Sequence, residues 1–300
     1  MARDARSIAL TVARVVAVVL VVAFLVRAVV ASGHELRTVS LGVRAPWLVA
    51  AAAVQLAAFP LLPLAWRGLV RAAGHPLGPR PAIRIWSMSQ VGRFVPSALP
   101  AFVARAHLSA RVGVPGPVAA ATMVVEIGLL VLVGAVIAVA LLPVASVPTA
   151  ARVAVAAVGL LALALVPAGL RRSRRWTSRV ALDWRPGPLA AAEALFCLNA
   201  ALKGVAFVLF AAALLPVGTS QAPLLVGALN ASVVLGTVGV TPAGLGVREG
   251  AMAALLDGSF GLGDAAALAV AYRGFELAVE LIWLGVVQLP TFRRREGADD

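Results

Sequence analysis

The sequence has 300 residues, of which 61% are hydrophobic and only 13% are charged, and its mean hydropathy is +0.97. Soluble domains contain roughly 45–50% apolar and 25% charged residues, so this composition excludes a soluble globular protein. Apolar runs of about 20 residues, the length that a helix needs to cross about 30 Å of hydrocarbon, recur along the chain. The sequence therefore predicts an all-α integral membrane protein, with residues 1–300 forming a single transmembrane domain.

In chain order, the apolar runs predict six full transmembrane helices: Ile8–Val30, Pro46–Leu69, Pro117–Leu142, Ala150–Leu170, Leu189–Leu215 and Asp264–Leu289. The first is interpreted as a retained signal anchor, because its apolar stretch exceeds the roughly 7–15 residues of a cleaved signal peptide.

Two further segments, Ile83–Ala110 and Gln221–Asp257, fit the membrane badly as single spans because prolines and glycines interrupt them. The second breaks at Thr241–Gly246, and each of its apolar halves is too short for a comfortable crossing. Lipid cannot satisfy the backbone groups that such breaks leave free, so both segments are expected to be buried in protein or to line a cavity.

The net charge of +13 comes from arginines that concentrate at the ends of the predicted spans. Such arginines set membrane orientation and contact anionic lipid, so nucleic acid is not an expected partner. Loops Arg67–Arg84 and Arg171–Arg185 are basic, whereas Pro143–Thr149 and Pro216–Gln221 carry no charge. The positive-inside rule then predicts a multi-pass protein of the cell membrane with both termini, including the tail 293–300, in the cytoplasm.

With this orientation, each interrupted segment must return to the side from which it enters, as a re-entrant hairpin of broken helices. The chain then divides into two halves, 1–145 and 146–292, each with two spans, one hairpin and one further span. The halves run in opposite directions through the membrane. Such inverted repeats are a recurrent architecture of transporters.

The second hairpin contains the stretch GVTPAGLGVREG, residues 239–250, in which Pro242 ends one half-helix and Gly244 and Gly246 permit a tight turn. The N-terminus of the following half-helix exposes unpaired N–H groups and a partial positive charge. Together with Arg248 it predicts a site for a phosphate or carboxylate. The alternative is that Arg248 and Glu249 pair with other buried groups and hold the hairpin together.

Other charged residues lie within the apolar segments, where they are costly and tend to mark function. Arg105 of the first hairpin could meet an anionic head group. Arg273 and Glu276 share one face of the last span, so they either form a local ion pair or line a substrate path. Lys203, the only lysine of the chain, needs an acidic partner, and the candidates are Glu126, Glu249 and Glu276.

No enzyme activity, cofactor or metal site is expected. The sequence contains no HExxH, GxSxG or Walker motif and no Cys/His metal cluster. A dinucleotide-binding reading of the glycines would need a βαβ unit, which the composition excludes.

Three stretches together resemble the lysylphosphatidylglycerol synthase transmembrane family, over roughly Ile8 to Leu289: PAGLGVRE at 242–249, AYRGFE at 271–276, and two prolines followed by Arg-Ala at 96–106. Members include the membrane half of bifunctional lipid aminoacylases, which translocates the modified phospholipid, stand-alone proteins without an assigned activity, and proteins linked to lipid-carried glycan pathways. The resemblance implies these motif positions: Arg105, Pro242, Gly244, Gly246, Glu249 and Arg273. Two positions depart from the family's pattern, Ala243 in place of a glycine and Ile127 in place of an arginine after Glu126.

These observations predict a flippase-like protein that binds an anionic phospholipid or a lipid-linked sugar and moves its head group across the bilayer. In this hypothesis both hairpins form one central site, where Arg105, Arg248 and Arg273 contact the head group and Glu126 or Glu249 balances the charge. The alternative is a non-transporting membrane partner of a lipid-modifying or glycosyltransfer enzyme.

Overall fold

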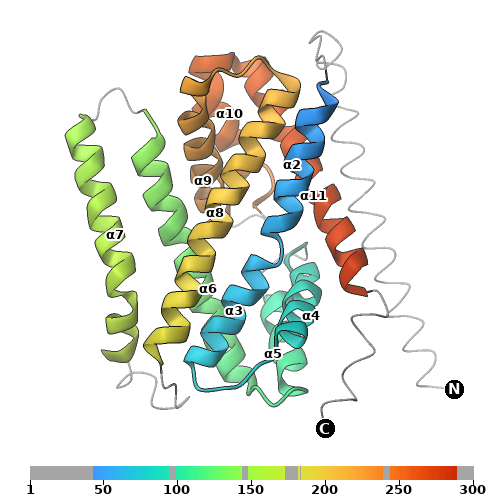
Figure 1. Cartoon of the computed structure of the whole chain (residues 1–300), viewed down its shortest axis with the longest axis vertical. Helices are drawn as coiled ribbons and strands as arrows, with labels where there is room; N and C mark the ends of the chain where they lie inside the picture. The colour runs from blue at the N-terminus through green and yellow to red at the C-terminus, as the bar shows by residue number, and fades with distance from the viewer. Residues whose placement is uncertain are drawn as a thin grey trace, which may run out of the picture.

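A computed structural model describes residues 43–94, 99–143, 148–172, 182, 184–238 and 244–288 of the chain. The first predicted span, the motif residue Pro242 and the tail 293–300 lie outside the described residues. Throughout the described part the regular secondary structure is helical (Figure 1), which confirms the predicted all-α class.

The helices follow the predicted elements closely in both position and length. In chain order they are α2 (Ala45–Ala58), α3 (Leu61–Ala72), α4 (Pro79–Gln90), α5 (Leu99–Ala110), α6 (Gly116–Leu141), α7 (Thr149–Arg172), α8 (Pro186–Leu214), α9 (Ala222–Val238), α10 (Val247–Phe260) and α11 (Leu262–Gln288). Val91–Phe94 forms a short 3₁₀ turn directly after α4, and Thr219–Gln221 forms another directly before α9.

Five helical segments among the described residues are long and apolar enough to cross a membrane: Ala45–Ala72, Gly116–Leu141, Thr149–Leu170, Pro186–Leu214 and Thr219–Val238. The last of these corrects the expectation that both halves of the second hairpin are too short to cross, since α9 and its preceding turn make 20 residues. Helix α11 has 27 residues but is absent from this set. The charged residues within α11 account for the difference, and they face protein rather than lipid.

The predicted span Pro46–Leu69 consists of two helices, α2 and α3, that meet at Pro60. Proline has no N–H to continue the helical hydrogen bonds, so the helix is interrupted there. Both helices pack antiparallel against α8, where the backbone N–H of Arg44 donates to Ala213 O at 2.9 Å. At the interruption the side-chain amide of Asn199 donates to Ala58 O at 2.9 Å. A polar group of α8 thus stabilises the break.

The two interrupted segments form helical hairpins, α4–α5 and α9–α10, at opposite ends of the helix bundle (Figure 1). In the first, a Cβ atom at Gly92 would lie 2.6 Å from Ala101 N, so the close return of the chain requires glycine. In the second, Gly244 and Gly246 have φ of +70° and +80°, which confirms the predicted glycine turn. The hairpins therefore have the arrangement expected for segments that enter from opposite sides.

The interior contains two hydrophobic cores, one around α3, α4 and α6 and the other around α9, α10 and α11. Each core takes side chains from both halves of the sequence. Leu129 and Phe196 belong to the first core, and Ala51 and Leu268 belong to the second. Neither half therefore packs as an independent unit, and the division into halves 1–145 and 146–292 stays a prediction about internal symmetry.

Candidate functional site

The first group of buried charges connects the α4–α5 hairpin to α6 and α3. The Arg105 guanidinium, whose residue is only 1% exposed, forms an ion pair with Glu126 and donates from Nε to Ser89 Oγ at 3.0 Å. It also lies over the rings of Trp66 and Trp86, at 5.1 and 5.6 Å from their centroids. Trp86 Nε1–H donates to the other Glu126 oxygen at 2.7 Å. Both carboxylate oxygens therefore have protein donors, and the group is closed.

This closed group argues against the expectation that Arg105 contacts a head group. A ligand would have to displace Glu126 from a buried ion pair, and breaking such a pair is strongly unfavourable. The two tryptophans had not been predicted as partners, because these contacts depend on how α3, α4 and α5 pack together. The geometry is that of an anchor for the first hairpin.

The second group, called here the Glu276 cluster, consists of Lys203 on α8, Arg248 and Glu249 on α10, and Arg273 and Glu276 on α11. Glu276 contacts three cations: Lys203 Nζ at 3.3 Å, Arg248 NH2 at 3.0 Å and Arg273 NH1 at 3.6 Å. Arg273 Nε also lies 3.5 Å from Glu249 Oε1. One buried carboxylate thus joins three helices.

The glycine-rich turn positions the two α10 members of this cluster. The backbone N–H of Gly246 donates to Glu249 Oε2 at 2.7 Å, so this carboxylate caps the start of α10. The Arg248 side chain passes directly over Gly236 of α9, where a Cβ atom would lie 2.2 Å from Arg248 Cγ. Gly236 is therefore required for Arg248 to reach Glu276.

The Glu276 cluster brings three cations, Lys203, Arg248 and Arg273, together with two carboxylates, Glu249 and Glu276. Glu280, one turn further along α11, is also buried. Charged side chains within a membrane protein are costly and tend to mark function. Fixed positive charge with several N–H donors suits a phosphate or carboxylate.

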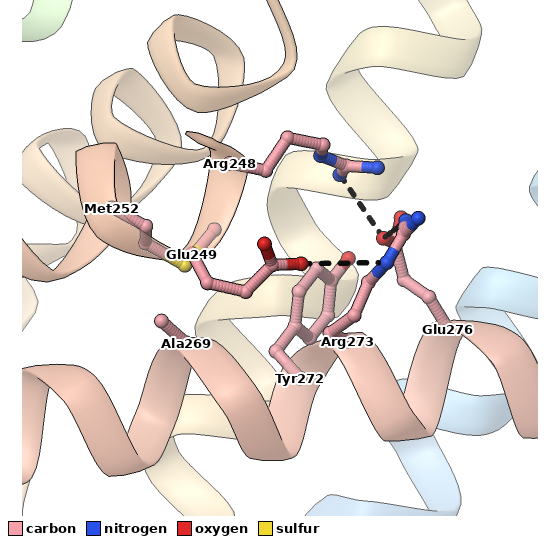
Figure 2. Close-up of a pocket in the computed structure, with 7 residues that line it drawn as sticks. All are labelled: Arg248, Glu249, Met252, Ala269, Tyr272, Arg273 and Glu276. Carbon is pink, nitrogen blue, oxygen red and sulfur yellow. Dashed lines mark hydrogen bonds and ion pairs between the residues drawn. The ribbon is translucent and has the colours of Figure 1, made fainter. Parts of the chain in front are cut away.

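Side chains of α10 and α11 surround a small cavity at this cluster, and Figure 2 shows the seven that line it: Arg248, Glu249, Met252, Ala269, Tyr272, Arg273 and Glu276. The space is about large enough for one water molecule. The Tyr272 hydroxyl, on a residue that is 1% exposed, points toward the ion pairs, and none of the described residues offers it a hydrogen bond. It is a hydrogen-bond donor beside the ion pairs that has no partner among the described residues.

The structure brings together Arg248, Glu249, Arg273 and Glu276, with Gly244 and Gly246 in the adjoining turn. It does not unite them with Arg105 and Glu126 in one central site. Helices α5 and α6 do not pack extensively against α10 or α11, and the two groups adjoin different hydrophobic cores.

The structure also resolves the alternatives that the charges left open. Lys203 pairs with Glu276, and Arg273 makes the local contact to Glu276 on its own helix. Arg248 and Glu249 pair with α11, so they do hold the hairpin in place in this conformation. Lys203 joins the site from outside the motifs, although a lone lysine within a span was a usable signal. Tyr272 belongs to the AYRGFE stretch but had not been predicted as a site residue.

Comparison with known proteins identifies the family. The family model described as lysylphosphatidylglycerol synthase TM region matches residues 8–283, a range that includes both hairpins and the whole Glu276 cluster. No curated protein and no solved structure matches the chain. The chain therefore belongs to the lysylphosphatidylglycerol synthase TM region family.

Proposed function

We propose that this membrane protein binds an anionic phospholipid or a lipid-linked sugar at the Glu276 cluster and moves its head group across the bilayer. The observation that carries the proposal is the convergence of three cations, from α8, α10 and α11, on the buried carboxylate of Glu276. Family membership supports a flippase-like protein and leaves the substrate open.

The donors of the cluster suit a phosphate. Arginine presents several N–H groups in one plane and binds phosphate oxygens in pairs, and the start of α10 adds the partial positive charge of a helix N-terminus. The cavity is too small for a head group as it stands. Entry therefore requires α10 to move away from α11, and the turn at Gly244 and Gly246 supplies the backbone freedom for that movement.

We propose that Arg105 and Glu126 anchor the first hairpin and do not contact the head group. Their ion pair is closed by Ser89 and two tryptophans, which leaves the second hairpin as the mobile one. This role differs from the one that the sequence suggested for Arg105.

We also propose the orientation in the cell membrane and both termini in the cytoplasm. One end of the bundle carries the α3–α4 loop, the α5–α6 loop and the end of α7 (Figure 1). Among the described residues this end is rich in arginine: Arg71, Arg80, Arg84, Arg111 and Arg172. The opposite end has Arg44 and Arg152, together with Asp257 and Asp264. The positive-inside rule places the arginine-rich end in the cytoplasm.

Reconstitution of the full chain into liposomes tests the proposal. Fluorescent phosphatidylglycerol and a prenyl-linked sugar phosphate serve as probes, and loss of fluorescence to an external quencher reports movement. We expect Arg248→Gln and Arg273→Gln to slow movement at least tenfold, because each removes a donor for the head group. Arg111→Gln is the matched control, since Arg111 is exposed and forms a hydrogen bond with His107, away from the Glu276 cluster.

Equal rates for the wild type, Arg248→Gln and Arg273→Gln would refute the assignment of this site. If the wild-type protein moves none of the lipids, translocation itself is refuted. That result favours the alternative of a non-transporting partner of a lipid-modifying or glycosyltransfer enzyme. No catalytic activity is proposed for the chain, and lipid recovered from the assay should be chemically unchanged.

A further inference from the structure

We infer that Glu276 occupies the place of the ligand's phosphate in the closed site, so that this carboxylate and the phosphate of the lipid compete for the same cations. This inference rests on the proposed function and adds to it a built-in competitor. It is carried by the geometry around one carboxylate.

Glu276 is bound as a ligand anion would be. Its Oε1 accepts from Lys203 Nζ at 3.3 Å, and its Oε2 accepts from Arg248 NH2 at 3.0 Å, so two oxygens of one anion are held by cations of two other helices. A phosphate presents its oxygens to the same kinds of donor. While Glu276 holds them, Lys203 and Arg248 are not free for a ligand.

Glu276 can release Lys203 and Arg248 and still keep Arg273 as a neighbouring positive charge. Arg273 lies one turn before it on the same helix, with NH1 at 3.6 Å from Glu276 Oε2, and so moves with it. Lys203 and Arg248 belong to α8 and α10, and separation of α10 from α11 draws Arg248 away from Glu276. Lys203 is the most accessible of the three cations, with 28% of its side chain exposed, and is the first contact for an entering anion.

The donors around Glu276 suit a phosphate. Lys203 and Arg248, which Glu276 releases when the site opens, supply an ammonium and a guanidinium. The Tyr272 hydroxyl, which has no partner among the described residues, supplies a further donor for a phosphate oxygen.

A binding measurement on full-length protein in phosphatidylcholine nanodiscs tests the inference. The probe is dioctanoyl phosphatidylglycerol, and the variant Glu276→Gln keeps the size of the side chain while removing its charge. We expect binding to tighten about tenfold or more, within the range of coupling between competing sites. Asp264→Asn, which removes a carboxylate in the first turn of the same helix, should leave the affinity unchanged.

Two other ligands identify what is recognised. Dioctanoylglycerol has the same chains without the phosphate, and its binding should be the same in the wild type and in Glu276→Gln. Glycerophosphoglycerol carries the same phosphodiester without chains and should bind at least tenfold more weakly than the lipid. Equal tightening for dioctanoylglycerol would overturn the competitor role, and equal affinity for glycerophosphoglycerol would overturn the assignment to a lipid.

A second variant, Lys203→Gln, tests the competitor role of Glu276 if Glu276→Gln does not fold. Lys203→Gln leaves Glu276 with both arginines, and we expect about tenfold weaker binding of dioctanoyl phosphatidylglycerol to the folded protein. Unchanged affinity in this variant would overturn the inference. Suppose that the wild type binds the lipid and Glu276→Gln binds it more tightly, but the wild type moves no lipid in liposomes. This result would refute the proposed translocation alone. Unchanged binding in Glu276→Gln with normal translocation would refute the competitor role alone.

Discussion

The ion pair between Arg105 and Glu126 makes the sharpest prediction about stability. Replacement of Arg105 by methionine keeps most of the side-chain volume between Trp66 and Trp86 but removes the charge. Glu126 is then left buried with only Trp86 Nε1–H as a described donor. We expect the free energy of unfolding to fall by about 3–5 kcal/mol, the usual cost of removing one partner from a buried ion pair.

The double variant Arg105→Met/Glu126→Gln separates the ion pair from the packing around it. Glutamine retains an acceptor for Trp86 while the pair becomes uncharged. A buried pair replaced as a whole is often nearly neutral in stability, so the double variant should be more stable than Arg105→Met. The interaction energy between the two positions is expected at about 2 kcal/mol or more.

Unfolding in mixed micelles of dodecyl maltoside and increasing SDS, followed by tryptophan fluorescence, measures both effects. Arg111→Met is the control, because this arginine follows the same hairpin but is exposed, and exposed ion pairs contribute about 0–1 kcal/mol. A loss below about 1 kcal/mol in Arg105→Met, or additive losses in the double variant, would refute the role of this pair as an anchor.

Two further substitutions test how the second hairpin and the kinked span are held. Gly236→Ala places a Cβ atom 2.2 Å from Arg248 Cγ, so we expect a loss of about 1–3 kcal/mol and slower lipid movement. Gly250→Ala, where no atom lies within 4 Å, is its control, and equal stability of the two variants would contradict the argument. Asn199→Leu removes the donor to Ala58 O at the α2–α3 break, and we expect the free energy of unfolding to fall by about 1–3 kcal/mol in the same assay. Asn199→Asp tests whether an amide N–H is needed, because aspartate has no N–H to donate. A wild-type midpoint for Asn199→Leu would show that the break does not depend on this bond.

The two hairpins have contrasting electrostatics. The first hairpin buries one cation against one carboxylate and surrounds them with aromatic rings. The second contributes an arginine and a carboxylate to a larger cluster of charges, next to a cavity and a turn of two glycines with positive φ. The closed group suits the anchor proposed for the first hairpin, and the cavity and glycine turn suit the movement proposed for the second.

The sequence by itself determined the membrane class, the helix positions and the interruptions. Apolar run length and the conformational limits of proline and glycine act locally, so α6, α7, α8 and the turn at Gly244 and Gly246 could be predicted from neighbouring residues alone. It also marked the charged side chains of the candidate site, because charges within apolar runs are conspicuous.

Only the tertiary structure decided which charges meet. Arg105 and Glu126 are 21 residues apart, and Lys203 and Glu276 are 73 apart, and no local pattern selects one buried carboxylate over another. That choice depends on which helices pack together, and helix packing arises from side-chain shape over the whole interior. The same packing separates Arg105 from the Glu276 cluster, places Tyr272 beside that cluster, and so divides the residues of one predicted site into two groups.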